Sequence, residues 1–299
     1  MSTIQLPLIF QAFYCEPMAL ERGHFYSLHN FLLSRMAGGE GDLMQAVPQE
    51  KPGKFGHQRA SIARPALMAS GEVDGRYYFT AQGRKDVAVI PWNGVMAKNA
   101  GFLQEACMGM VSHDRLSHAT QQAMAAPEIT KIVFDIGSPG GQVVGTPELA
   151  NLIRMAGESK ATYAFVDYMM ASAAVYAGIQ AQEIYMTPSA SIGSIGTILG
   201  VLDDSVRMEK EGLKLELFTA GKHKAIGRPG QQLTADDRKY LQETVNNANQ
   251  QFVSAVKTAR PGVAKEVLTD AKMYTGEQAV KLGLVDGLVS GWEEFIDLL

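Results

Sequence analysis

Residues 129–150, "ITKIVFDIGSPGGQVVGTPELA", combine an apolar run, a glycine-rich turn and a helical pattern. The run over 129–137 predicts a buried strand, and the pattern from Thr146 predicts a helix. Between them, "SPGG" at 138–141 leaves backbone N–H groups without side-chain cover beside a helix N-terminus. Such a turn can bind an oxyanion or a phosphate. It can equally be a strand-to-helix turn that uses glycine only for its φ angles.

The alternation of strand and helix continues on both sides of this stretch. It predicts an α/β fold with a largely parallel sheet and helices packed on its faces. Gly, Pro, Gln and charged residues fill 37–65, so we expect an N-terminal arm and linker over 1–65 and one domain over 66–299. The expected strands are 87–96, 129–137, 161–168, 183–187 and 214–220, and the expected helices are 112–126, 146–159, a short helix from Ser172, 205–212, 234–260 and one within 275–287.

The overall composition is that of an ordinary globular protein. Of the 299 residues, 46% are hydrophobic and 19% charged, and the formal net charge is -4. This balance gives no electrostatic reason to bind nucleic acid or an anionic membrane surface. No apolar run reaches the roughly 18 residues of a membrane span, so we expect a cytoplasmic protein without a membrane anchor. Cys15 and Cys107 lack metal-ligand spacing and the glycine turn matches no nucleotide-binding motif, so no metal or cofactor is expected.

The stretch "MASAAVYAG" at 170–178 places one hydroxyl, Ser172, among small and apolar residues. Ser172 lies at the start of a predicted helix, where aligned N–H dipoles favour an alkoxide or a developing oxyanion. It is therefore a candidate nucleophile, with a helix N-cap as the alternative. It does not lie in a GxSxG motif, so nothing supports an α/β-hydrolase.

A serine nucleophile needs a base at neutral pH. No histidine lies between Ser172 and His223, whereas "GKHK" at 221–224 supplies Lys222, His223 and Lys224 after the predicted strand 214–220. A lysine has an ordinary pKa of about 10.4 and serves as a base only where burial keeps it neutral. The alternative for this segment is a solvated basic loop.

Four motifs follow one another along the chain: "GSPGG" after a strand, "MASAAVYAG", "SIGSIGTI" and "GKHKAIG", and "TGEQAVKLGLVDG" comes after them. In this order they resemble the signal peptide peptidase A family of Ser/Lys peptidases. The resemblance covers about residues 85–290. It implies the fold of the Clp protease proteolytic subunit and of crotonases, built from repeated strand–helix units with a mainly parallel sheet, here with an N-terminal extension.

Carried over residue by residue, the resemblance makes Ser172 the nucleophile and Lys224 the general base. Ser194, in "SIGSIG", matches the second serine, whose hydroxyl orients the lysine amine. Gly140 and Gly141 match the turn that supplies oxyanion-hole N–H groups. The implied reaction is hydrolysis of a peptide bond through an acyl-enzyme, and its rate is expected to rise with pH because the lysine must be neutral.

The opening residues and the short single-copy domain are more similar to the tailed-phage branch of the family, the head maturation proteases. That similarity implies polypeptide substrates such as scaffold, capsid or portal proteins, a homo-oligomeric ring, and a location in the host cytoplasm or prohead interior. Two alternatives remain open. One is a bacterial cytoplasmic peptidase that degrades signal peptides or unfolded chains, and the other is a catalytically silent protein of capsid assembly that binds scaffold.

Overall fold

The structure, a computed structural model, describes residues 17–20, 76–100 and 109–299. The expected arm and linker over 1–65 therefore lie outside the described residues, apart from 17–20. Cys15 and Cys107 also lie outside them.

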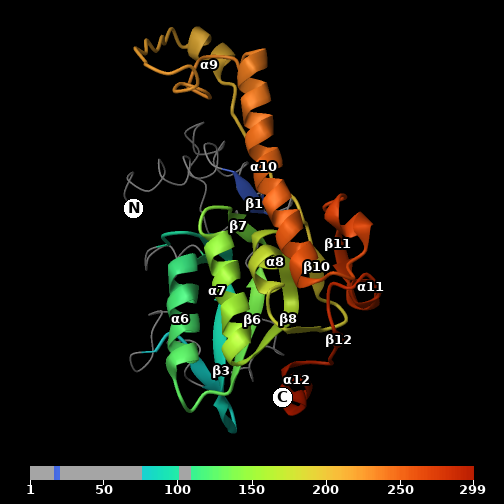
Figure 1. The fold of residues 1–299 in the computed structure, drawn as a ribbon. Helices are drawn as coiled ribbons and strands as arrows, with labels where there is room; N and C mark the ends of the chain where they lie inside the picture. The colour runs from blue at the N-terminus through green and yellow to red at the C-terminus, as the bar shows by residue number, and fades with distance from the viewer. Residues whose placement is uncertain (1–16, 21–75, 101–108) are drawn as a thin grey trace.

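A mainly parallel sheet forms the centre of the molecule (Figure 1). Its strands are β2 (Phe79–Ala81), β3 (Arg84–Asn93), β6 (Lys131–Ser138), β8 (Ala161–Ala171), β9 (Glu183–Met186), β10 (Ser191–Gly193), β11 (Met273–Thr275) and β12 (Gly287–Leu288). The order is β11-β10-β8-β6-β3-β2, with β9 paired to β8 and β12 to β9. β3, β6, β8, β9 and β10 run parallel, whereas β2 and β11 are antiparallel to their neighbours. The predicted α/β fold around a mainly parallel sheet is confirmed.

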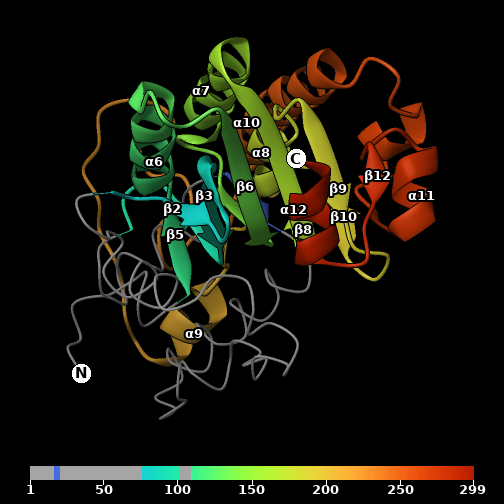
Figure 2. The ribbon, with the colours of Figure 1, turned by 90° about the horizontal axis from the view of Figure 1, so that it is seen from below.

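Helices cover both faces of this sheet (Figure 2). One face packs against α6 (His113–Ala125), α7 (Thr146–Ser159), α8 (Ala173–Gly178) and α10 (Ala235–Ala259), and the other against α12 (Trp292–Leu298). Successive strand residues point to opposite faces. Val133 and Phe165 accordingly pack with Phe295 of α12, while their neighbours Ile132 and Ala164 join the larger cluster under the other helices. The remaining helices are α9 (Ser205–Lys210), a short 3-10 helix (Lys265–Leu268) and α11 (Gly276–Lys281).

A smaller sheet contains the two strands that follow β3 and β6 directly along the chain, namely β4 (Val95–Ala97) and β7 (Gly140–Gln142). Its other strands are β1 (Met18–Leu20) and β5 (Met110–Ser112), and the order is β1-β7-β4-β5. The expected single strand over 87–96 is interrupted at Gly94, which has a φ of 99°. A Cβ at Gly94 would lie 1.9 Å from the carbonyl oxygen of Gly109, so a side chain there would block this approach. The break lets β4 leave the large sheet and pair with β7.

The long helix α10 extends away from the sheets (Figure 1). The chain that joins α9 to α10 lies near the N-terminal end of α10, the end that is farther from the sheets. The buried residues of α10, Phe252 and Val256, lie in its C-terminal half. The strand expected over 214–220 is wrong: these residues form no strand and are exposed. The alternating Leu215 and Leu217 satisfy the pattern of a strand, but within the described part of the chain no strand pairs with them. Phe218 is 97% exposed.

Candidate active site

Ser172 follows the last residue of β8 and precedes α8 in a backbone conformation that is rare for a residue with a side chain. Its φ is 55° and its ψ is -117°, a strain of roughly 1–3 kcal/mol. The Ser172 N–H donates to the carbonyl oxygen of Gly193 at 2.9 Å, and its own carbonyl accepts from the N–H of Tyr176 at 2.9 Å. These bonds hold the strained residue in place. The side chain is buried and makes no capping hydrogen bond; Oγ lies 3.4 Å from the carbonyl oxygen of Gly196. An N-cap role therefore does not explain this serine.

The glycine turn lies directly against the Ser172 backbone. A Cβ at Gly140 would be 2.8 Å from the carbonyl oxygen of Ala171 and 2.8 Å from the nitrogen of Ala173. The Gly140 N–H donates to Ser138 Oγ at 3.2 Å, which holds the turn closed. The Ala173 N–H is the first in α8, and the first N–H groups of a helix have no acceptor within it. Ala173 is thus a further candidate oxyanion donor, and the sequence gave no signal for it because the donor belongs to the backbone and not to a side chain.

Ser194 stands beside Ser172 because their strands are neighbours. β10 runs parallel to β8 with Gly193 opposite Ala171, so each serine is the first residue beyond this pair. Ser194 also has a φ of 55°, and its N–H donates to the carbonyl oxygen of Lys272 at 2.8 Å. The structure therefore brings Ser172, Ser194 and the glycine turn together.

Lys224 lies in an exposed turn near the N-terminal end of α10, whereas α8, which follows Ser172, packs against the C-terminal half of that helix. Its neighbour His223 stacks on Tyr240 with ring centroids 4.6 Å apart, which fixes this turn against the first turns of the helix. Tyr176, one turn after Ser172, packs against Phe252 with ring centroids 5.0 Å apart. The 12 residues from Tyr240 to Phe252 span about 18 Å of helix. Within one chain, the structure does not bring Lys224 to Ser172.

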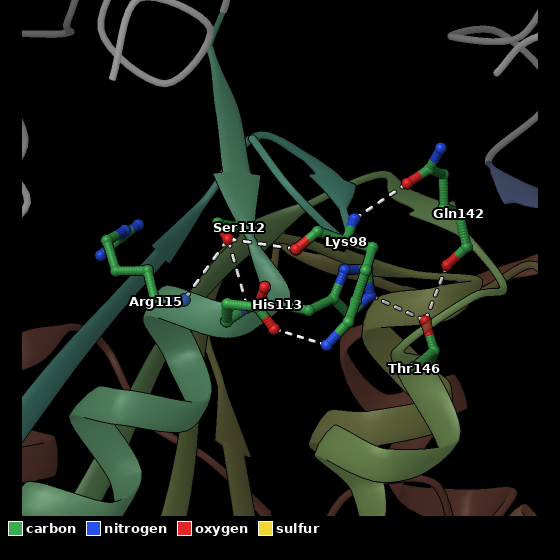
Figure 3. Close-up of polar contacts among 7 residues, drawn as sticks. Lys98, Ser112, His113, Arg115, Gln142 and Thr146 are labelled. Atoms are coloured by element: carbon green, nitrogen blue, oxygen red, sulfur yellow. Dashed lines mark hydrogen bonds and ion pairs between the residues drawn. The ribbon is translucent and has the colours of Figure 1, made fainter. Parts of the chain in front are cut away.

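A polar cluster holds the far end of β7 (Figure 3). Thr146 Oγ1 donates to the carbonyl oxygen of Gln142 at 2.7 Å and lies 2.9 Å from His113 Nε2. Because the threonine proton is already used, His113 Nε2–H is the donor of this second bond. Gln142 Oε1 accepts from the Lys98 N–H at 2.8 Å, and Lys98 Nζ pairs with Asp114 at 2.5 Å. Burial lowers the pKa of His113, which favours the neutral ring. These bonds tie the strand that begins at Gly140 to α6, α7 and β4.

The assembled groups are suited to acyl transfer: a serine with a strained backbone, a second serine at the end of the neighbouring strand, and backbone N–H donors next to the first serine. Across the described ranges, no group of three or more His, Cys, Asp or Glu side chains is arranged to hold a metal ion. None of the helices in those ranges is long and apolar enough to cross a membrane.

Comparison with known proteins confirms the predicted family resemblance. Residues 155–298 match peptidase family S49. The chain is 29% identical to Capsid assembly protease C of Escherichia phage lambda over 95% of its length and 63% of the relative. It is 26% identical to Head-tail preconnector protein GP5 of Enterobacteria phage P21 over 94% of its length and 55% of the relative. It is also 25% identical to "Putative signal peptide peptidase SppA" of Enterococcus faecium, over 74% of this chain and 64% of that one.

The chain thus spans less than two thirds of the length of each of these relatives. Among solved structures, it is similar to a mutant of the 1510-N membrane-bound stomatin-specific protease. That likeness has a TM-score of 0.44 and 15% identity and covers 71% of this chain and 83% of the other.

Proposed function

We propose that this chain, whose residues 155–298 match peptidase family S49, is a serine endopeptidase with Ser172 as its nucleophile and Lys224 as its general base. The observation that carries the proposal is the conformation of Ser172, a buried serine held at a φ of 55° against a glycine turn. Strain of this kind persists only where surrounding structure enforces it, and it clusters at active sites.

In the proposed reaction, Ser172 Oγ attacks the carbonyl carbon of a peptide bond while the neutral Lys224 amine takes the hydroxyl proton. The resulting oxyanion accepts from the N–H groups of Gly141 and Ala173. Gly140, whose own N–H bonds to Ser138, has no side chain and so allows backbone atoms to approach the turn closely. The lysine passes the proton to the leaving amine, and water then hydrolyses the ester by the reverse sequence. Ser194 orients the lysine amine from its place beside Ser172.

Because Lys224 of the same chain lies at the far end of α10, we propose that a second copy of the chain supplies the lysine. The chain between α9 and α10, which carries Lys224, exposes apolar side chains that support such a contact. These are Leu213, Leu215, Leu217 and Phe218, which have no packed partners of their own among the buried clusters of the described residues. Covering them on a neighbouring copy would withdraw both the apolar side chains and the lysine from water, which favours a neutral amine. Repetition of this head-to-tail contact produces a closed ring when the rotation allows.

The substrates that fit this proposal are extended polypeptides of a phage head, namely scaffold, capsid or portal proteins. The names of the two phage relatives, a capsid assembly protease and a head-tail preconnector, support this assignment. The reaction would then take place in the host cytoplasm or inside the prohead. The similarity to the Enterococcus faecium protein supports a second candidate, degradation of signal peptides or unfolded chains by the same chemistry.

Cleavage of casein between pH 6 and 10 tests the proposal, with wild type compared to Ser172→Ala, Lys224→Ala and the adjacent control His223→Phe, which keeps an aromatic ring against Tyr240. We expect the first two substitutions to remove cleavage and the control to retain it, with wild-type activity rising with pH. Cleavage by Ser172→Ala would refute the nucleophile, and cleavage by Lys224→Ala would refute the base.

A further inference from the structure

The short strand β1 lies beside Ser172 as an extended peptide with partners on both sides. On one side it runs antiparallel to β7, with Ala19 opposite Gly141. On the other, Met18 exchanges both backbone hydrogen bonds with Ile198, each at 2.8 Å. Ile198 follows the turn that contains Ser194, so this segment lies between the two stretches of chain that flank the nucleophile. All three residues of β1 are buried.

The hydrogen-bond pattern places the carbonyl of Ala19 in the space next to the serine. The Val143 N–H donates to the carbonyl oxygen of Pro17 at 3.4 Å. Bonded pairs alternate along an antiparallel ladder, so the next bonded pair joins the Ala19 carbonyl to the Gly141 N–H. The Ala19 oxygen lies 2.3 Å from the point that a Cβ of Gly140 would occupy, and the Ala173 nitrogen lies 2.8 Å from the same point. The carbonyl of Ala19 is therefore located between the glycine turn and the start of α8.

We propose that Met18–Leu20 is a built-in substrate of this enzyme and that the bond between Ala19 and Leu20 is the first one it cuts. This inference rests on the proposed peptidase function. Ser172 Oγ bonds to the carbonyl carbon of Ala19 and gives its proton to the neutral base. The C–N bond to Leu20 breaks, and its nitrogen leaves with that proton as an amine. Water then cleaves the ester, which frees Ser172 and leaves a carboxylate on Ala19.

The packing of β1 also defines the class of substrate. Ala19 is 2% exposed and its methyl group belongs to the main apolar cluster, together with Ala173 and Ala174. A longer side chain at this position would have to displace close-packed atoms. The packing around Ala19 therefore selects extended chains with a small residue before the cleaved bond. Met18 and Leu20 point to the opposite face of the strand, where both are buried as well.

Intact mass and N-terminal sequencing of the full chain test this directly. Wild type should release residues 1–19 and acquire Leu20 as its N-terminus, whereas Ser172→Ala should remain whole. Ala19→Leu should slow the cut by roughly tenfold or more, and Ala19→Gly, the matched small variant, should retain it. A synthetic peptide with the sequence of residues 13–26, carrying serine in place of Cys15, should be cut by the wild-type enzyme after the same alanine. The peptide keeps the test valid if an Ala19 variant fails to fold.

Casein cleavage in the same samples separates this inference from the function on which it rests. Wild type that cuts casein but leaves both the Ala19–Leu20 bond and the peptide whole overturns the built-in substrate alone. A cut at another bond, or a cut that persists in Ser172→Ala, also overturns it. Wild type that cuts none of the three overturns the peptidase function and this inference with it.

Discussion

The N–H of Ser172 donates to the carbonyl oxygen of Gly193 at 2.9 Å, so the strand that leads to one serine fixes the backbone of the other. Gly193 lies opposite Ala171 in the parallel pairing of β10 with β8. Ser172 and Ser194 thus follow the C-terminal ends of two neighbouring parallel strands, and both have a φ of 55°. The proposed nucleophile and the hydroxyl beside it are positioned by the sheet itself.

The strain at Ser172 predicts that glycine is the more stable residue at this position. Glycine adopts a positive φ without steric cost but loses more backbone entropy on folding than alanine. The relief of a strain of about 1–3 kcal/mol outweighs this entropic cost of glycine. We therefore expect Ser172→Gly to be about 1 kcal/mol more stable than Ser172→Ala, and both variants to be inactive. Urea unfolding of the two variants measures the difference. Equal stabilities would mean that the observed φ stores no strain.

The close approach at the glycine turn predicts unequal effects of two glycine substitutions. Gly140 and Gly83 both have a positive φ, but an added Cβ at Gly83 would meet nothing within 4 Å. Gly83→Ala should cost about 1 kcal/mol of unfolding free energy and keep activity. Gly140→Ala should cost roughly 3 kcal/mol or more and abolish cleavage, because its methyl group would clash with backbone atoms of Ala19, Ala171 and Ala173. Similar losses in stability and activity for the two variants would contradict the packing of the turn.

His113 predicts a pH dependence of folding stability. Burial lowers its pKa in the folded protein, whereas the unfolded chain has the ordinary value of about 6.5. Between these two values the unfolded state binds more protons, so stability should fall as the pH drops below about 6.5. Unfolding free energies of wild type and His113→Gln between pH 5 and 8 test this. The slope should be smaller in the variant, and an unchanged slope would rule out His113 as its source.

A lysine from a second copy predicts that two inactive variants restore each other. In an equal mixture of Ser172→Ala and Lys224→Ala, about a quarter of the sites in a head-to-tail ring would pair an intact serine with an intact lysine. Casein cleavage should therefore return after the two proteins are unfolded and refolded together. If both groups acted within one chain, no site in the mixture would be complete and cleavage would stay absent.

Strong local patterns allowed much of the fold to be predicted. The helix over 146–159 was expected with the bounds that the structure has, because its periodicity is clear and a glycine stands before it. The strand before Ser172 and the long helix within 234–260 were also expected and observed. The prediction of a strand over 214–220 was wrong. Alternating apolar residues indicate which side chains would be buried on one face of a strand. They do not show whether a partner strand exists in the same chain.

The site was only partly accessible from the sequence. Ser172, Ser194 and the glycine turn were singled out by their motifs, and they lie together in the structure. The positive φ of both serines could not be foreseen, since nothing in a serine's type marks a strained backbone. The distance to Lys224 depends on the direction of α10, which local sequence does not determine. The strand Met18–Leu20 is too short to carry a recognisable period.

The most direct test of the central claim is covalent labelling of the nucleophile with a peptidyl phosphonate that ends in alanine, followed by peptide mapping. We predict a single adduct on Ser172, formed faster as the pH rises and absent in Ser172→Ala. An adduct on another residue, or equal labelling of Ser172→Ala, would contradict the assignment of Ser172 as the catalytic nucleophile.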